Sequence, residues 1–258
     1  MKSKIVFFIL NVFFLSSPAF LLAQGRLPVL VYHHIEDPLK SEVSCTPNEF
    51  LAQMQAILKN GFTPLNIQEA RLFIGGALKR IRNPVLITFD DGYESVYNFA
   101  FPVLEKLKIP ATVFMVTARI GQKPQFSNYL TRNEIAEMAS STLISFGSHT
   151  DNLHTDIMRI KNAFKQNPNP VDELLKEDLK LSKEKLENIT KCEVFALAWP
   201  YGKHDDATVK IARNCGFHLI FTSKYGYNEP SSDPFEIKRI PVTSRDTPDS
   251  VIKKIKGR

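Results

Sequence analysis

Seven short apolar segments, separated by stretches of helical spacing, constrain the fold of this 258-residue chain more than any other feature. Each segment is short enough for a β-strand, and the spacing between them leaves room for a helix. Strands that alternate with helices in this way form parallel βα units, so the sequence predicts an α/β fold with its strands in one parallel sheet or barrel. The segments are Pro28 to Tyr32, Pro84 to Phe89, Ala111 to Val116, Leu143 to Phe146, Val194 to Ala198, His218 to Phe221 and Ile237 to Val242.

Two of the intervening helices have readable starts. Thr46-Pro47-Asn48-Glu49 and Thr131-Arg132-Asn133-Glu134 both have the Thr and Glu spacing of a capping box, and each precedes apolar residues at helical spacing. The first of these helices is predicted to end at Asn60-Gly61. Val171 to Ile189 has apolar positions set among many charges, which indicates a long amphipathic helix on the outside of the fold.

The N-terminus differs in composition from the rest of the chain. Lys2 and Lys4 precede a nearly unbroken apolar run from Ile5 to Ala23, with small residues at Ala19 and Ala23. This pattern is typical of a secretory signal peptide, and the run is also close to the length of a spanning helix. We therefore expect residues 1–24 to be a signal peptide or an N-terminal anchor, and residues 25–258 to be the catalytic domain. Either alternative predicts an exported protein that is periplasmic, on the cell surface or secreted.

Charge and cysteine content bear on the binding partners and on possible disulfide bonds. The formal net charge is +6, and much of the excess lies near the C-terminus, where Lys253 and Lys254 precede two more basic residues. Such an end can be a solvated helix terminus or a contact to an anionic surface, and nothing indicates nucleic acid. Of the three cysteines, Cys192 and Cys215 could pair and leave Cys45 free, which the sequence alone does not decide.

Two acidic residues follow the second apolar segment directly, in Thr88-Phe89-Asp90-Asp91-Gly92. Adjacent carboxylates at the end of a buried strand repel each other and lose hydration, so a compensating charge such as a divalent metal ion is expected beside them. The alternative is a turn in which the Asp pair caps the next helix and Gly92 supplies a positive φ.

Two histidines, His149 and His154, follow the fourth apolar segment, Leu143 to Phe146. A spacing of five residues does not place two side chains on one face of a helix, but an irregular loop can bring them to one ion. Because the C-terminal ends of parallel strands meet at one face, one Asp and both histidines are expected to converge there. Three protein ligands leave open positions for water and substrate, and the second Asp can then act as a base in the hydrolysis of an amide or ester.

The Thr88 to Gly92 and Ser148 to His154 segments together resemble the NodB-homology polysaccharide deacetylases, carbohydrate esterase family 4. The resemblance covers roughly Pro28 to Val242 and implies a distorted (β/α) barrel of about seven strands. It also implies that Asp90 is the catalytic base, and that Asp91, His149 and His154 bind the metal. The five-residue histidine spacing and the early Tyr32-His33 are similar to the branch that acts on poly-β-1,6-N-acetylglucosamine in biofilm matrices.

This sequence departs from the usual family pattern at two places. Where the family has Arg-x-Pro-Tyr, the chain has Ala198-Trp199-Pro200-Tyr201, so the role of that Arg must be met otherwise or lost. No late Leu-x-His is present, and the resemblance to the biofilm-polymer branch implies His33 as the general acid. It further implies that Trp199, Pro200 and Tyr201 bind substrate, although this segment can also be a packed loop. Arg239 could pair with a site carboxylate or be an ordinary strand-edge charge.

These observations predict a metal-dependent hydrolase that removes N-acetyl groups from an N-acetylglucosamine polymer and releases acetate. The cofactor is a divalent ion, with zinc favoured over cobalt, nickel or iron. The alternative for the same site is a different substrate, namely peptidoglycan, chitin oligomers or O-acetylated xylan. A non-catalytic glycan-binding relative is the alternative from a different class. Membrane contact is expected only through the N-terminal segment, and the oligomeric state is left open.

Overall fold

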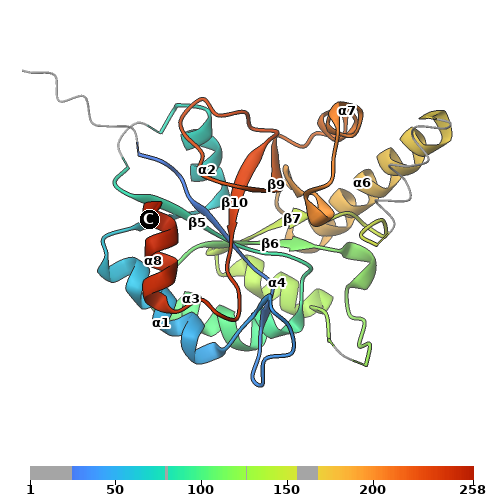
Figure 1. The fold of residues 1–258 in the computed structure, drawn as a ribbon. Helices are drawn as coiled ribbons and strands as arrows, with labels where there is room; N and C mark the ends of the chain where they lie inside the picture. Colours follow the sequence, from blue (N-terminus) through green and yellow to red (C-terminus); the bar gives the residue numbers. More distant parts are fainter. Residues whose placement is uncertain (1–24, 79–80, 126, 156–167) are drawn as a thin grey trace, which may run out of the picture.

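The computed structural model describes residues 25–258 except 79–80, 126 and 156–167 (Figure 1). The expected signal peptide or anchor, residues 1–24, lies outside these ranges. Among the helices that are described, none combines the length and apolar composition needed to cross a membrane.

Seven parallel strands close into a barrel, one of the two arrangements that the alternation of segments allows and the one that the family resemblance implies. The neighbours around the ring are β1, β5, β6, β7, β8, β9 and β10, and the ring closes where β1 pairs with both β5 and β10. Their bounds are β1 Val29–Tyr32, β5 Pro84–Phe89, β6 Ala111–Met115, β7 Ile144–Ser148, β8 Ala196–Ala198, β9 Leu219–Tyr225 and β10 Ile237–Pro241. The barrel is distorted, since the register between β9 and β10 shifts between Ile237 and Arg239.

Three short strands lie outside this ring and were not predicted. β4, Thr63–Leu65, pairs with the first half of β5, and β2, His34–Ile35, pairs with β3, Ser44–Cys45, in a separate two-stranded sheet. Segments of two or three residues are too short to show an apolar period, so no pattern in the sequence indicated them.

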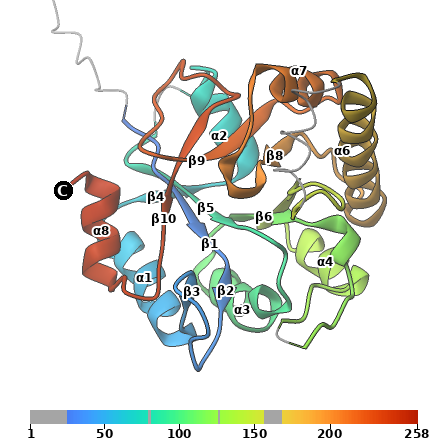
Figure 2. The same cartoon turned by 45° about the vertical axis from the view of Figure 1, so that its right-hand side comes forward.

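Helices surround the barrel (Figure 2). They are α1 Pro47–Lys59, α2 Ile67–Ile74, α3 Phe101–Leu107, α4 Arg132–Ser140, α6 Pro168–Thr190, α7 Asp206–Asn214 and α8 Pro248–Lys256, with short helical turns η1 Val96–Ala100, η2 Thr117–Arg119 and η3 Pro200–Gly202. The predicted caps form: Thr46 accepts from the Glu49 N–H, and Thr131 and Glu134 make a full capping box. The amphipathic helix predicted from Val171 corresponds to α6, which begins three residues earlier.

Alternate strand residues point to the two sides of the barrel wall. One apolar cluster joins the wall to the outer helices and includes Ile87 and Leu197, whereas a second fills the inside and includes Leu86, Phe114 and Phe221. α2 adds Ile67, Phe73 and neighbouring residues to this inner cluster. The inward positions become polar toward the C-terminal strand ends, which is where a site can form.

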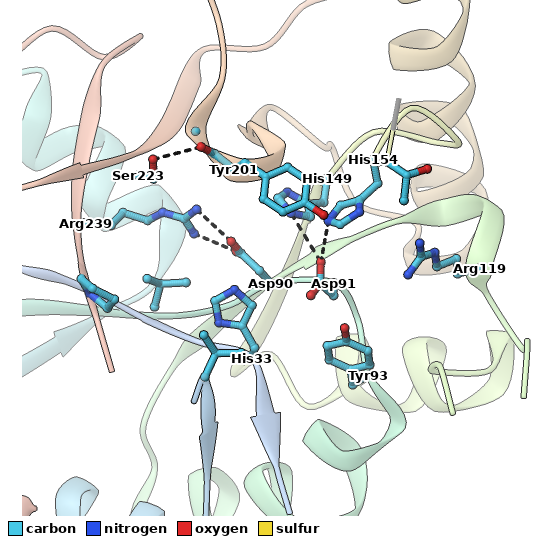
Figure 3. A pocket seen from close by; sticks show the side chains of 15 residues that line it. His33, Asp90, Asp91, Tyr93, Arg119, His149, His154, Tyr201, Ser223 and Arg239 are labelled. Carbon is cyan, nitrogen blue, oxygen red and sulfur yellow. Dashed lines mark hydrogen bonds and ion pairs between the residues drawn. The ribbon is translucent and has the colours of Figure 1, made fainter. Parts of the chain in front are cut away.

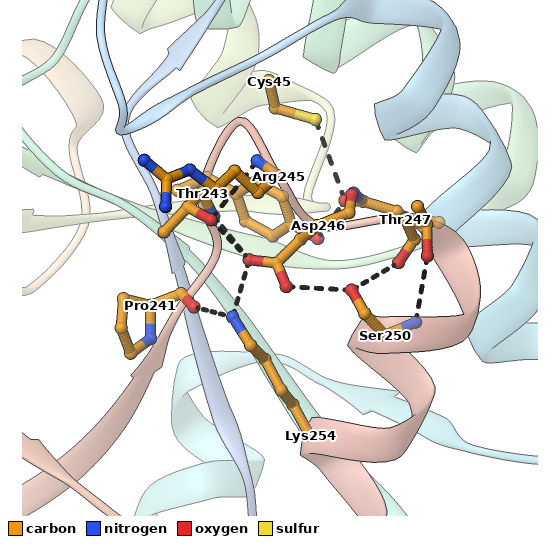
Figure 4. A network of polar contacts seen from close by, with 10 residues as sticks. Cys45, Pro241, Thr243, Arg245, Asp246, Thr247, Ser250 and Lys254 are labelled. Atoms are coloured by element: carbon orange, nitrogen blue, oxygen red, sulfur yellow. Dashed lines mark hydrogen bonds and ion pairs between the residues drawn. The ribbon is translucent and has the colours of Figure 1, made fainter.

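A polar network fixes the C-terminal helix to the barrel (Figure 4). The Asp246 carboxylate accepts from Lys254 Nζ at 2.6 Å and from Ser250 Oγ at 2.9 Å. The Asp246 carbonyl accepts from Gln53 Nε2 at 2.7 Å, and the Tyr32 hydroxyl donates to Gln53 Oε1 at 2.9 Å. The network therefore connects α8 to the end of β1, the residue directly before His33.

The three cysteines are free thiols. Cys192 is exposed, whereas Cys45 and Cys215 are buried. The pairing of Cys192 with Cys215 that the sequence allowed is therefore not formed in this structure.

Candidate active site

A cavity of about 490 Å³ lies at the C-terminal ends of the barrel strands (Figure 3). Every charged residue predicted for the site lines it: His33 after β1, Asp90 and Asp91 after β5, and His149 and His154 after β7. The cavity is also lined by residues from other strand ends and loops, among them Tyr93, Arg119, Tyr201, Ser223 and Arg239.

Strand alternation explains why several of these side chains point inward. Leu86 belongs to the inner cluster, and Asp90 lies an even number of residues after it. Ile237 is also in this cluster, and Arg239 follows two positions later. These charged side chains thus continue the inward-facing positions beyond the apolar layer and are almost fully buried, with 3% of each residue exposed.

Asp91, His149 and His154 converge on one point. Asp91 Oδ1 lies 3.0 Å from His154 Nε2 and 3.6 Å from His149 Nε2. One donor atom from each residue lies within 4.8 Å of the other two. Two atoms that each bind a zinc-sized ion at about 2.1 Å in a tetrahedral arrangement are about 3.4 Å apart, so this spacing fits one shared ion.

The protonation of these residues also suits a metal. His149 Nδ1 lies 2.7 Å from the Ala198 carbonyl, so Nδ1 carries the proton and Nε2 keeps a lone pair facing Asp91. Burial lowers the pKa of His149 and favours its neutral form. Burial would raise the pKa of Asp91, but its close contacts with His154 and His149 outweigh burial and hold that pKa well below its usual range. The residues form a candidate Asp-His-His site for a divalent cation.

A left-handed backbone turns Asp91 toward the histidines. Asp91 has φ of 71° and Gly92 has φ of 79°, whereas Asp90 directly follows Phe89, the last residue of β5. A Cβ on Gly92 would lie 2.4 Å from Met115 Sδ, so only glycine fits without a shift. The sequence allowed either a turn with a positive φ at Gly92 or a metal site at the Asp pair. Both features are compatible, because the positive φ of the turn also directs the Asp91 carboxylate into the cavity.

Asp90 is held by Arg239, which comes from β10. The guanidinium donates to both carboxylate oxygens, from Nη1 to Oδ1 at 2.7 Å and from Nη2 to Oδ2 at 2.8 Å, and its Nε donates to the Thr222 carbonyl at 2.9 Å. Burial alone would raise the pKa of Asp90, but the charge of Arg239 beside it holds that pKa below its usual value. Of the two alternatives for Arg239, the pair with a site carboxylate is confirmed.

In Figure 3, His33 and Tyr201 lie on either side of Asp90 and Asp91. His33 is half-buried, and among the described residues its Nδ1 has no hydrogen-bond partner. Tyr201 is 59% exposed, has φ of 57°, and places its ring centroid 5.2 Å from that of His154. Both line the cavity.

Trp199 and Pro200, which the resemblance implies as substrate-binding residues, are not among the residues that line the cavity. Both are buried, and Trp199 has no exposed surface. Trp199 packs in the cluster between the barrel wall and the outer helices. The segment thus combines the packed loop that the sequence left open with one exposed residue, Tyr201.

Tyr93 and Arg119 are among the lining residues that were not predicted from the sequence. Tyr93 follows the Asp-Asp-Gly motif directly and stacks on His34 at 3.4 Å and on Tyr129 at 5.1 Å between ring centroids. Burial and the charge of Asp91 raise the pKa of the Tyr93 hydroxyl. Arg119 lies in η2 after β6 and donates to the Tyr129 hydroxyl. Position after a strand was the available signal, but no motif marked Arg119.

Several known proteins are similar to this chain in sequence and fold. Residues 78–220 match the family described as polysaccharide deacetylase. The poly-beta-1,6-N-acetyl-D-glucosamine N-deacetylase of Staphylococcus epidermidis is 31% identical over 243 residues, covering 88% of this chain and 82% of that protein. The solved structure of IcaB from Ammonifex degensii is 31% identical with a TM-score of 0.79, covering 90% of this chain and 98% of that one. The Streptococcus pyogenes deacetylase PplD, at 24% identity and a TM-score of 0.78, shares the fold.

The chain therefore belongs to the polysaccharide deacetylase family. It is a hydrolase that acts on amide bonds of an acetylated polysaccharide. The resemblance to NodB-homology deacetylases, and the barrel it implied, are confirmed.

Proposed function

We propose that this protein removes N-acetyl groups from poly-β-1,6-N-acetylglucosamine, with Asp91, His149 and His154 as metal ligands. The convergence of these three side chains beside the Asp90–Arg239 pair carries the proposal. The choice of substrate is supported by a relative that is named for this polymer and is 31% identical to this chain. An export signal in residues 1–24 and a role in a biofilm matrix would accord with such a polymer.

The roles of the residues follow from their positions. A bound divalent ion, zinc being favoured for this donor set, would acidify a water molecule and polarise the acetamide carbonyl. Asp90 takes a proton from the attacking water, and Arg239 keeps Asp90 ionised and fixed in orientation. His33 gives a proton to the nitrogen as the C–N bond breaks, which leaves acetate and an amine. Tyr201, exposed at the rim, contacts the sugar.

The test is acetate release by the full-length protein from poly-β-1,6-N-acetylglucosamine, with zinc, cobalt or nickel added or a chelator present. We expect activity that the chelator abolishes and metal restores. Loss of the base in Asp90→Asn should lower kcat by about 10²- to 10⁴-fold. His218→Ala is the matched control, because His218 is exposed and does not line the cavity.

A panel of substrates separates the alternatives. Peptidoglycan, chitin oligomers and acetylated xylan are assayed beside the favoured polymer. Preferred cleavage of one of these would reassign the substrate, and cleavage of xylan esters alone would contradict the amidase assignment. Equal acetate release by wild type and Asp90→Asn would remove Asp90 as base, and no turnover on any glycan would favour a binding protein.

A further inference from the structure

The loop that carries both histidines runs along one face of α6. After β7 the backbone enters the left-handed region at Thr150, with φ of 72°. The next two N–H groups both donate to the carboxylate of Asp178, Asp151 N to Oδ1 and Asn152 N to Oδ2, each at 2.7 Å. One side chain of α6 thus accepts two consecutive backbone donors of the His149–His154 loop.

Two more residues of the same helix contact this segment. Ser182 shares a hydrogen bond with Ser148, and Lys185 Nζ lies 2.6 Å from Asp151 Oδ1. Residues 178, 182 and 185 are spaced by four and three, so they lie on one face of α6. η2 contacts the loop from another side, where Thr117 donates to Asp151 Oδ1 at 2.5 Å.

The two histidines differ in how they are held. His149 is fixed by its own hydrogen bond to the Ala198 carbonyl at 2.7 Å. His154 has no such bond, since among the described residues its Nδ1 is buried without a partner. A metal-binding histidine ordinarily has its ring oriented by a bond to the second nitrogen. The position of His154 therefore depends on the backbone that leads to it, which is the backbone that Asp178 holds.

The burial of Asp178 is costly without a role of this kind. The residue is only 8% exposed. Burial raises its pKa to about 6, even though the donated N–H groups act to lower it. At neutral pH the group is thus an ionised carboxylate, and both of its oxygens act as acceptors.

We propose that Asp178 is a positioning residue for the metal site, which holds the backbone between His149 and His154 in the turn that brings His154 to Asp91. The proposal rests on the proposed function, in which Asp91, His149 and His154 bind a divalent ion. Asp178 contacts neither the ion nor the substrate and acts through the loop. Ser182 and Lys185 support the same turn from the same helix face.

The test measures metal affinity independently of turnover. The full-length protein is compared with Asp178→Asn, which keeps the side-chain shape but turns one acceptor oxygen into a donor group that faces a backbone N–H. The dissociation constant for Zn²⁺ is measured by competition with a chromogenic chelator, and the visible spectrum of bound Co²⁺ reports the ligand geometry. Glu177→Gln is the matched control, because it removes one charge from the adjacent, exposed position of α6.

We expect Asp178→Asn to weaken Zn²⁺ binding by about 10- to 100-fold, the range found when support of a metal ligand is lost. Its Co²⁺ spectrum should change, and its acetate release should approach that of wild type as metal concentration is raised. Glu177→Gln should bind Zn²⁺ as wild type does. A purely structural role would lower the melting temperature of the metal-free protein and leave the affinity of the folded fraction unchanged.

His154→Ala separates failure of this proposal from failure of the proposed function. If His154→Ala loses Zn²⁺ binding while Asp178→Asn binds like wild type, the positioning role is overturned and the metal site stands. If His154→Ala also binds like wild type, the metal site itself is overturned. Should Asp178→Asn fail to fold, Lys185→Met, which removes only the contact to Asp151, must weaken Zn²⁺ binding, and unchanged affinity in that variant overturns the proposal.

Discussion

Replacement of Arg239 by Met gives the sharpest test of how the barrel sustains a buried base. In the folded protein the Arg239 and Asp90 side chains are 4% and 5% exposed and are joined by two hydrogen bonds of 2.7 and 2.8 Å. Met has similar length and no charge, so the variant leaves Asp90 equally buried but without its counter-ion.

The magnitude follows from what the charge then lacks. Removing one partner of a buried ion pair costs about 3–5 kcal/mol of unfolding free energy, because the remaining charge is uncompensated. The carboxyl can avoid this cost by binding a proton, since burial raises the pKa of Asp90 when Arg239 no longer opposes it. The substitution therefore reverses the direction in which stability depends on pH. In wild type the pair stabilises the fold above the ordinary pKa of an Asp, whereas in Arg239→Met stability is greatest at low pH and is lost as the pH rises through the raised pKa of Asp90.

Two measurements check this reasoning. Urea unfolding from pH 5 to pH 8 should show the deficit of Arg239→Met growing with pH. The acidic limb of the pH–kcat/KM profile for acetate release should move to higher pH, because Asp90 must be ionised to act as base. Arg245→Met is the matched control, since Arg245 and its partner Glu42 are both 83% exposed and such a pair contributes about 0–1 kcal/mol. An Arg239→Met enzyme with wild-type stability and an unmoved acidic limb would refute the argument.

Three further predictions concern separate parts of the molecule. Gly92→Ala places a Cβ 2.4 Å from Met115 Sδ at a positive φ, so we expect a loss of about 1–3 kcal/mol in unfolding free energy, measured by urea titration, and a weaker metal site. Asp246→Asn should lower the unfolding free energy by about 1 kcal/mol at pH 7. Burial would raise the pKa of Asp246, but the hydrogen bond from Lys254 outweighs it and the pKa is lowered, so the difference between variant and wild type should vanish as the pH falls through that pKa. A difference that does not change with pH would contradict this reasoning. His33→Gln should lower kcat by about 10²-fold and leave the Zn²⁺ dissociation constant unchanged, so weakened Zn²⁺ binding would show that His33 supports the metal site instead.

The sequence alone determined the parallel α/β architecture and the Asp and His residues that follow two of its strands. Apolar segments of strand length that alternate with amphipathic helices allow few other folds, and the seven segments became the seven strands of the ring. Because the strands are parallel, residues just after β5 and β7 had to meet at one end, which is where Asp91, His149 and His154 lie. Short-range patterns suffice for these conclusions, since each depends on neighbours along the chain.

Contacts between distant segments were decided only by the tertiary structure. Arg239 meets Asp90 across 149 positions because the ring closes with β1 between β10 and β5, and no local pattern marks such a partner. Asp178 reaches the histidine loop from a helix whose charges are otherwise those of any solvated face. Trp199 is buried between the barrel wall and the outer helices, whereas Tyr201, two residues on, is exposed. This difference depends on how η3, with a left-handed φ of 57° at Tyr201, packs on the barrel. Local sequence places the strands along the chain to within a few residues, whereas the closure of the ring decides which side chains then face each other.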